Sequence, residues 1–177
     1  MRRALDLLYT ASGAFAAICL AGIAVLMLTQ AAGREFGLLI RGSDDIASWL
    51  CAASAFFALG HTFRHGELVR VGLFIDRLEG GARRAAEIWA LGATLVVVGY
   101  MAYAVVKFVY ESWKFNEVAQ GLLQIPIWIP QTAFAGGVVI FFIAVLDELV
   151  TVLAGRKPAY QLADEDRRAR GDFSESV

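Results

Sequence analysis

The sequence predicts an all-α integral membrane protein built from four transmembrane helices. Hydrophobic residues make up 58% of the 177 positions and charged residues only 19%, a balance that is unusual for a soluble domain. The chain contains four long apolar runs, and a membrane-crossing helix needs roughly 20 residues of this kind. We expect the four spans at about 7–31, 45–63, 87–110 and 128–153.

The first apolar run follows Arg2 and Arg3 and holds no charge over residues 7–33. Because the apolar core of a cleavable signal peptide is only about 7 to 15 residues long, a retained helix is the better interpretation. Small residues recur on one face of this helix, which lets the backbone of a neighbouring helix approach closely in lipid. They are Ala14, Ala17, Ala21 and Ala24.

The second run opens with Asp44 and Asp45, stays uncharged over 46–63 and ends at Arg64. The segment that follows, 67–79, is too charged to cross a bilayer, yet its apolar residues recur at helical spacing. We therefore expect an amphipathic helix at the headgroup boundary, with a solvated connector as the alternative. The recurring residues are Leu68, Val71, Ile75 and Leu78.

The third run covers 88–106, and its far end is rich in tyrosine and tryptophan, which suit a membrane interface. The fourth span is expected to begin near Pro126, Trp128 and Pro130. Since proline has no backbone N–H, both prolines belong before the helix or in its first turn, and the tryptophan marks the interface. Residues 1–155 then form one membrane domain, and residues 156–177 form a polar cytoplasmic tail.

The distribution of basic residues predicts the orientation of the chain in the membrane. Twelve of the 16 lysine and arginine residues lie before the first span, between the second and third spans, or after the fourth. Basic residues accumulate in loops that stay on the cytoplasmic side. We therefore expect both termini in the cytoplasm, an N-in/C-in topology.

The sequence offers little catalytic or metal-binding chemistry. A net charge of -1 argues against nucleic acid as a partner. Cys19 and Cys51 lie inside apolar runs, so neither a disulfide nor a redox pair is indicated. His61 and His65 have a spacing that can hold a metal ion, but a haem held by two histidines needs one from each of two helices. Hydrogen bonding at the cytoplasmic interface is the preferred interpretation, and we expect no enzyme activity and no cofactor.

The ionisable side chains lie near the ends of the spans. An ion-coupled transporter that works alone usually keeps an ionisable group near the bilayer midplane, and all four spans here are uncharged at their centres. Arg64 is expected at the depth of three carboxylates, and an unpaired charge near lipid is costly. We therefore expect Arg64 to pair with at least one of Asp6, Asp147 and Glu148.

Several stretches of the sequence resemble the DctQ-type small permease, the small membrane subunit of TRAP transporters. They are the acidic start of the second span with Trp49 a turn later, the span exit at 55–66, the segment 71–78 and the segment 124–130. The resemblance lies in the order of these stretches in a chain of four spans, and it covers most of the chain. The candidates for partner contact or structural pairing are Asp44, Asp45, Ser48, Trp49, Ala52, Ala55, His61, Arg64, His65, Pro126, Trp128, Pro130, Asp147 and Glu148.

The resemblance implies a sodium-coupled secondary transporter for organic acids in the bacterial inner membrane. Such a transporter consists of a periplasmic substrate-binding protein, a large permease that moves substrate with sodium, and a small subunit that braces the large permease as a heterodimer. Sodium coupling would then belong to the large subunit. Two other interpretations of the sequence remain, a haem- or quinone-associated membrane anchor of a respiratory complex and a small autonomous exporter.

Overall fold

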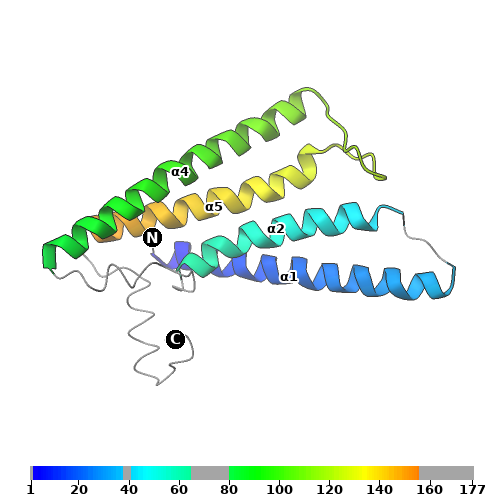
Figure 1. Cartoon of the computed structure of the whole chain (residues 1–177), viewed down its shortest axis with the longest axis horizontal. Helices are drawn as coiled ribbons and strands as arrows, with labels where there is room; N and C mark the ends of the chain where they lie inside the picture. The colour runs from blue at the N-terminus through cyan, green and yellow to red at the C-terminus, as the bar shows by residue number, and fades with distance from the viewer. Residues whose placement is uncertain (1, 38–40, 65–79, 156–177) are drawn as a thin grey trace, which may run out of the picture.

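The computed structural model describes residues 2–37, 41–64 and 80–155. They form four helices, α1 (Arg2–Glu35), α2 (Ser43–Arg64), α4 (Gly80–Lys114) and α5 (Trp128–Leu153), shown in Figure 1. Each helix is long and apolar enough to cross a membrane, which confirms the predicted all-helical fold with four candidate spans. The expected amphipathic helix at 67–79 and the polar tail at 156–177 lie outside the described residues.

The four helices lie side by side in the order α1, α2, α5, α4 (Figure 1). They form a fan: the start of α1 and the ends of α2 and α5 come together at one end, and the helices separate towards the other. We call these the narrow end and the wide end. A cluster of buried apolar side chains lies at the narrow end and joins all four helices. Its fully or almost fully buried members are Tyr9, Phe63, Leu91, Ala144, Val145 and Val152.

The helix ends follow from local sequence. Asp44 and Asp45 occupy the first turn of α2, where carboxylates interact favourably with the helix dipole. Pro130 lies in the first turn of α5 and Pro126 precedes the helix, as predicted. Gly155 ends α5 in a left-handed conformation, with a φ of 71°, and its N–H donates to the carbonyl of Val152 at 3.0 Å.

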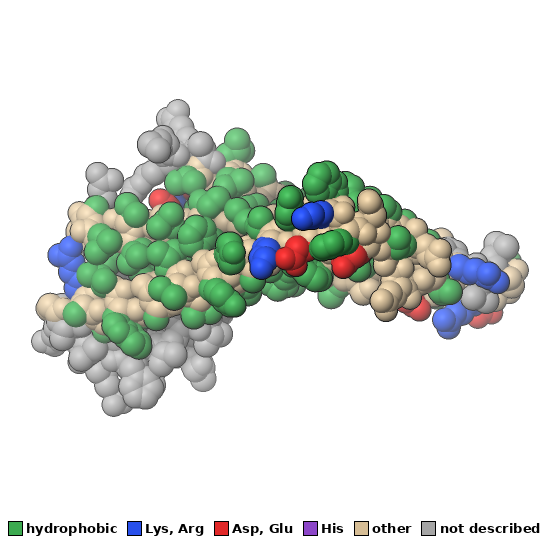
Figure 2. All heavy atoms as spheres, turned by 90° about the horizontal axis from the view of Figure 1, so that it is seen from above, with side chains coloured by type: hydrophobic (Ala, Val, Ile, Leu, Met, Phe, Trp, Pro, Cys, Tyr) green, Lys and Arg blue, Asp and Glu red, His purple; other side chains and the backbone are tan. Residues whose placement is uncertain are grey.

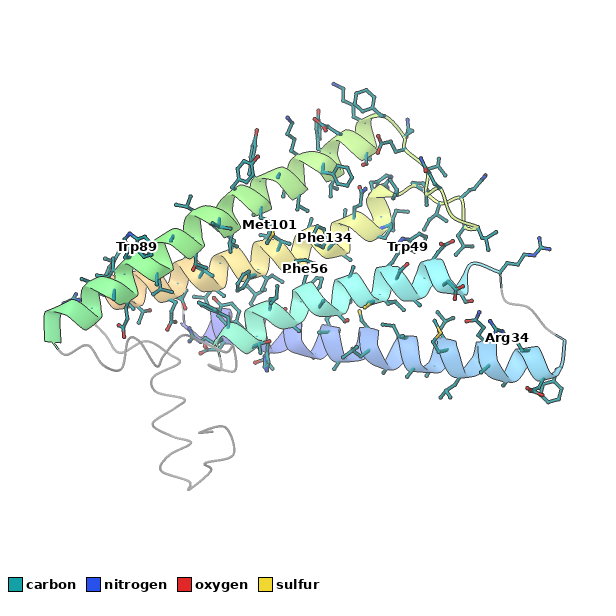
Figure 3. The ribbon with its side chains drawn as sticks, viewed as in Figure 1. Arg34, Trp49, Phe56, Trp89, Met101 and Phe134 are labelled. Carbon is teal, nitrogen blue, oxygen red and sulfur yellow. The ribbon has the colours of Figure 1, made fainter. Side chains whose placement is uncertain are left out.

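Glycine lets α2 and α5 pack backbone against backbone. A Cβ atom at Gly137 of α5 would lie 2.7 Å from the carbonyl carbon of Phe56 and 2.9 Å from the nitrogen of Phe57. One turn farther along the contact, Phe56 and Phe134 meet edge to face with ring centroids 4.3 Å apart (Figure 3). Close packing of this kind is a main source of helix association in lipid. Lipid tails are as apolar as the helix surfaces, so there is no hydrophobic driving force between helices.

We expect Gly137→Ala to destabilise the protein by about 1–3 kcal/mol, because the neighbour of the new methyl group is backbone and cannot rotate away. Gly92→Ala is the matched control, since a Cβ there meets nothing within 4 Å and alanine favours a helix more than glycine does. Thermal unfolding of the two variants in detergent measures the difference. Equal midpoints for both variants would show that α2 and α5 are not in close contact at Gly137.

A hydrogen bond and a close side-chain contact join α1 to α2. Ser12 is buried and its hydroxyl donates to the carbonyl of Phe57 at 2.5 Å. The ring of His61 lies over Gly13, where a Cβ atom would be 2.8 Å from the His61 Cγ atom. The face of α1 that α2 covers is therefore Tyr9, Ser12, Ala16 and Cys19, which are all buried. The alanines at 14, 17, 21 and 24 lie on an exposed face of α1 instead.

The outer helix α4 presents large apolar side chains to its surroundings. Figure 2, seen from above, shows hydrophobic side chains along most of this face. Trp89, Val96, Val97, Tyr100 and Tyr103 are each more than 60% exposed. A soluble protein seldom exposes a continuous apolar surface of this size, so the face is suited to lipid.

Candidate functional site

A network of charged side chains fastens three helices together at the narrow end. The guanidinium of Arg64, at the end of α2, donates through Nη1 to Asp147 of α5 at 2.7 Å and through Nη2 to Asp6 of α1 at 2.8 Å. The pairing expected for Arg64 is thus present with two of the three predicted carboxylates. We call Asp6, Tyr9, Arg64 and Asp147 the Arg64 cluster.

The Arg64 cluster is largely shielded from its surroundings. The side chains of Arg64 and Asp147 are 20% and 22% exposed, whereas that of Asp6 is 54% exposed. Tyr9 is buried, and the Arg64 Cζ atom lies 5.5 Å from the centroid of its ring, a cation–π contact. The planar guanidinium can bind two carboxylates and contact one aromatic face at the same time, which a lysine ammonium cannot do with the same geometry.

His61 extends the cluster by one further contact to α1. Its Nδ1–H donates to the backbone carbonyl of Tyr9 at 3.1 Å, which orients both the imidazole ring and the tyrosine next to Arg64. His65 lies outside the described residues, so the predicted histidine pair is not tested. Among the residues that the structure describes, no group of three or more His, Cys, Asp or Glu side chains is placed to hold a metal ion.

Two further charged residues lie at the narrow end. Glu148, the neighbour of Asp147, is buried with 3% of its surface exposed. Arg84 of α4 reaches the last turn of α5, and its Nη2 donates to the carbonyls of Val152 and Leu153 at 3.4 and 3.3 Å. Cations are favourable at a helix C-terminus, where carbonyls lack an intrahelical partner. Ion pairs and capping thus connect α1 to α2, α2 to α5 and α4 to α5 at this end.

A second polar contact lies at the wide end and involves Asp45. Its Oδ2 atom accepts the backbone N–H groups of Leu122 and Leu123, at 2.9 and 3.3 Å, in the loop between α4 and α5. Glycines make room for this contact, because a Cβ at Gly121 would collide with the Asp45 carboxylate and a Cβ at Gly42 with the Leu123 side chain. The neighbouring Asp44 is exposed.

Small side chains form an exposed row on α2. Ser48, Cys51, Ala52 and Ala55 recur at helical spacing, and all four are exposed. They form what we call the outward face of α2. The predicted small residues therefore do not pack this chain against itself, and Cys51 joins them. Trp49, by contrast, is half-buried, as are Trp128 and Pro130 at the start of α5, while Pro126 is exposed and forms an isolated antiparallel bridge with Val118.

Sequence reasoning missed the residues whose role depends on contacts between helices. Gly13, Gly42, Gly121 and Gly137 are needed for close approach, and Arg84 caps a helix far away in the sequence. Glycine within an apolar span was the available signal for Gly13 and Gly137. No sequence signal identified the partners.

The contacts at the narrow end can hold the helices in place, and the outward face of α2 can present a surface to a partner. The charged groups of the Arg64 cluster and Arg84 are engaged in ion pairs and helix capping. In a comparison with family models, residues 23–155 match the family described as "Tripartite ATP-independent periplasmic transporters, DctQ component". The match covers the last part of α1 and the whole of α2, α4 and α5. A comparison with curated proteins finds no match.

Proposed function

Because the chain belongs to the DctQ family, a component of tripartite ATP-independent periplasmic transporters, we propose that it braces the large permease of such a transporter and has no transport path of its own. It is a multi-pass membrane protein and a transporter component rather than a member of an enzyme family. The observation that carries the proposal is the absence of any Asp, Glu, Lys, Arg or His within 10–30, 46–60, 88–106 and 129–146, the middle parts of its four helices.

The narrow end supports a bracing role. The Arg64 cluster fixes α1, α2 and α5 relative to one another, and Arg84 adds α4. A subunit that supports a moving partner must itself be rigid, and ion pairs shared among several helices limit their relative movement. We propose that sodium coupling and recognition of an organic acid belong to the large permease, in a bacterial inner membrane, with a periplasmic binding protein that delivers the substrate.

We propose that the large permease contacts the outward face of α2. This face is exposed, covers 48–55 of α2 and carries small side chains, which allow a partner helix to approach closely. The exposed face of α4 is covered with bulky aromatic and β-branched side chains, which suit lipid better. The sizes of the exposed side chains therefore favour α2 over α4 as the helix that contacts the large permease.

Ala52→Trp should abolish co-purification with the large permease, because an indole on the outward face of α2 holds a partner helix several ångströms away. Val97→Trp on α4 is the matched control, since that position is 67% exposed among other large side chains. The measurement is the amount of permease that co-elutes with the tagged chain from a mild detergent, with chain abundance as the reference. Equal yields for the two variants would place the permease on another face, and no complex with the unmodified chain would refute the proposed function.

The N-in/C-in orientation remains a proposal that rests on the basic residues. In a background without Cys19 and Cys51, an impermeant thiol reagent should label Arg41→Cys from the periplasmic side and should leave Ala154→Cys unlabelled. Both positions are exposed, whereas Ser43, the first residue of α2, is buried and would report poorly. Labelling of Ala154→Cys from outside would reverse the topology.

A further inference from the structure

The loop between α4 and α5, residues 115–127, has a defined shape rather than an irregular one. Asn116, two residues after the end of α4, has a left-handed conformation with a φ of 49°. Ala119 donates its N–H to the carbonyl of Ile125 at 2.9 Å, and Ile127 donates to Glu117 at 3.0 Å, so the two arms of the loop run antiparallel. Ala119 between them is buried. The loop is therefore a short, folded hairpin.

Many backbone N–H groups of this loop have acceptors within the protein. Besides the two that pair the arms, Glu117 donates to Ser112 at 3.0 Å and Ile125 donates to Leu123 at 3.0 Å. The two at the tip, Leu122 and Leu123, donate to the Asp45 carboxylate of α2. A non-helical segment next to lipid needs hydrogen-bond partners for its backbone N–H groups within the protein, because little water is present to take their place.

The loop exposes three large apolar side chains beside a few polar ones. Phe115, Val118 and Leu122 are 68%, 49% and 75% exposed. Glu117 is the one charged residue within 115–127, and its carboxylate accepts a hydrogen bond from the buried Ser112 hydroxyl at 2.8 Å. A loop of this length that faced only water would gain nothing from exposing three large apolar side chains.

We propose that this hairpin rests in the interfacial layer of the bilayer, with Leu122 and its apolar neighbours among the lipid headgroups and first acyl carbons, and that Asp45 holds it there. Three observations support lipid as the occupant. The exposed side chains continue those of the last turns of α4, where Phe108, Tyr110 and Trp113 are each more than 50% exposed. The loop reaches less far along the long axis than the end of α1 that carries Arg34 (Figure 3). Its outer surface carries almost no charge, unlike a loop in water.

A nitroxide attached at Leu122→Cys tests the proposal in the full chain with its large permease, in lipid vesicles and in a background without Cys19 and Cys51. Collision with oxygen, which partitions into lipid, is compared with collision with a water-soluble nickel chelate. Arg41→Cys supplies the aqueous reference and Val97→Cys, on the exposed face of α4, the lipid reference. The ratio of oxygen to nickel collisions at Leu122 should exceed that at Arg41 by about threefold or more.

Asp45→Ala removes the acceptor of the two tip N–H groups and should lower the ratio at Leu122 to that at Arg41, while the ratio at Val97 stays unchanged. Asp45→Asn keeps an acceptor oxygen and should retain the higher ratio. A ratio at Leu122 equal to that at Arg41 in the unmodified chain would place the loop in water. Low collision rates with both reagents would place it against a protein partner, and an unchanged ratio in Asp45→Ala would show that Asp45 does not hold it. Each of these results overturns the proposal.

Discussion

Arg64→Ala should lower the stability of the chain by about 2 kcal/mol, because Asp147 and Asp6 then lose the cation that both of them bind. For a chain of this size, the thermal midpoint should fall by about 4–8 °C. Fully buried pairs cost more to break, but one fifth of the Arg64 side chain is exposed and Asp6 is more than half exposed, which reduces the penalty. Thermal unfolding of the purified chain in detergent measures the effect.

Two further variants separate the charge of Arg64 from its shape. Arg64→Lys keeps the charge but cannot bridge two carboxylates with a planar fork, so its midpoint should lie between those of Arg64→Ala and the unmodified chain. The matched control is Lys107→Ala, because Lys107 pairs with Glu111 at 3.7 Å on the exposed surface of α4. Such surface pairs contribute about 0–1 kcal/mol. If Arg64→Ala unfolds at the same temperature as Lys107→Ala, the Arg64 cluster does not fasten the narrow end.

Features that depend on depth in the membrane could be predicted from the sequence. Hydropathy identified the four helices, because a span must be long and apolar whatever its neighbours are. The pairing of Arg64 followed from the same reasoning, since a charge near lipid needs a counter-charge at equal depth and few were available. The two prolines predicted the start of α5 correctly because a missing N–H is tolerated only there.

Features that depend on which helix faces meet could not be predicted. The partner of Asp45 is a pair of backbone N–H groups more than 70 residues away, and every residue except proline carries such a group. The position of His61 over Gly13 and of α2 against Gly137 likewise depends on the lateral order of the helices, which hydropathy does not record. The small residues that the sequence singled out, on the outward face of α2 and on α1 at 14, 17, 21 and 24, are exposed, and other positions form the internal contacts.

Removal of this subunit should abolish transport by the complete transporter, even though we propose no transport path within this chain. The middle parts of its helices hold no charged group that could accompany an ion through the membrane. Its expected contribution is to keep the large permease in position while that subunit moves. A brace of this kind changes the population of the working conformation rather than the chemistry of the substrate site.

Uptake by reconstituted vesicles tests the central claim most directly. Vesicles that contain this chain and the large permease, supplied with the substrate-loaded binding protein and a sodium gradient, should accumulate the labelled organic acid. Vesicles with this chain alone should match empty vesicles, and vesicles with the large permease alone should fall to nearly the same level. Full uptake by the large permease alone, or any sodium-dependent uptake by this chain alone, would contradict the account.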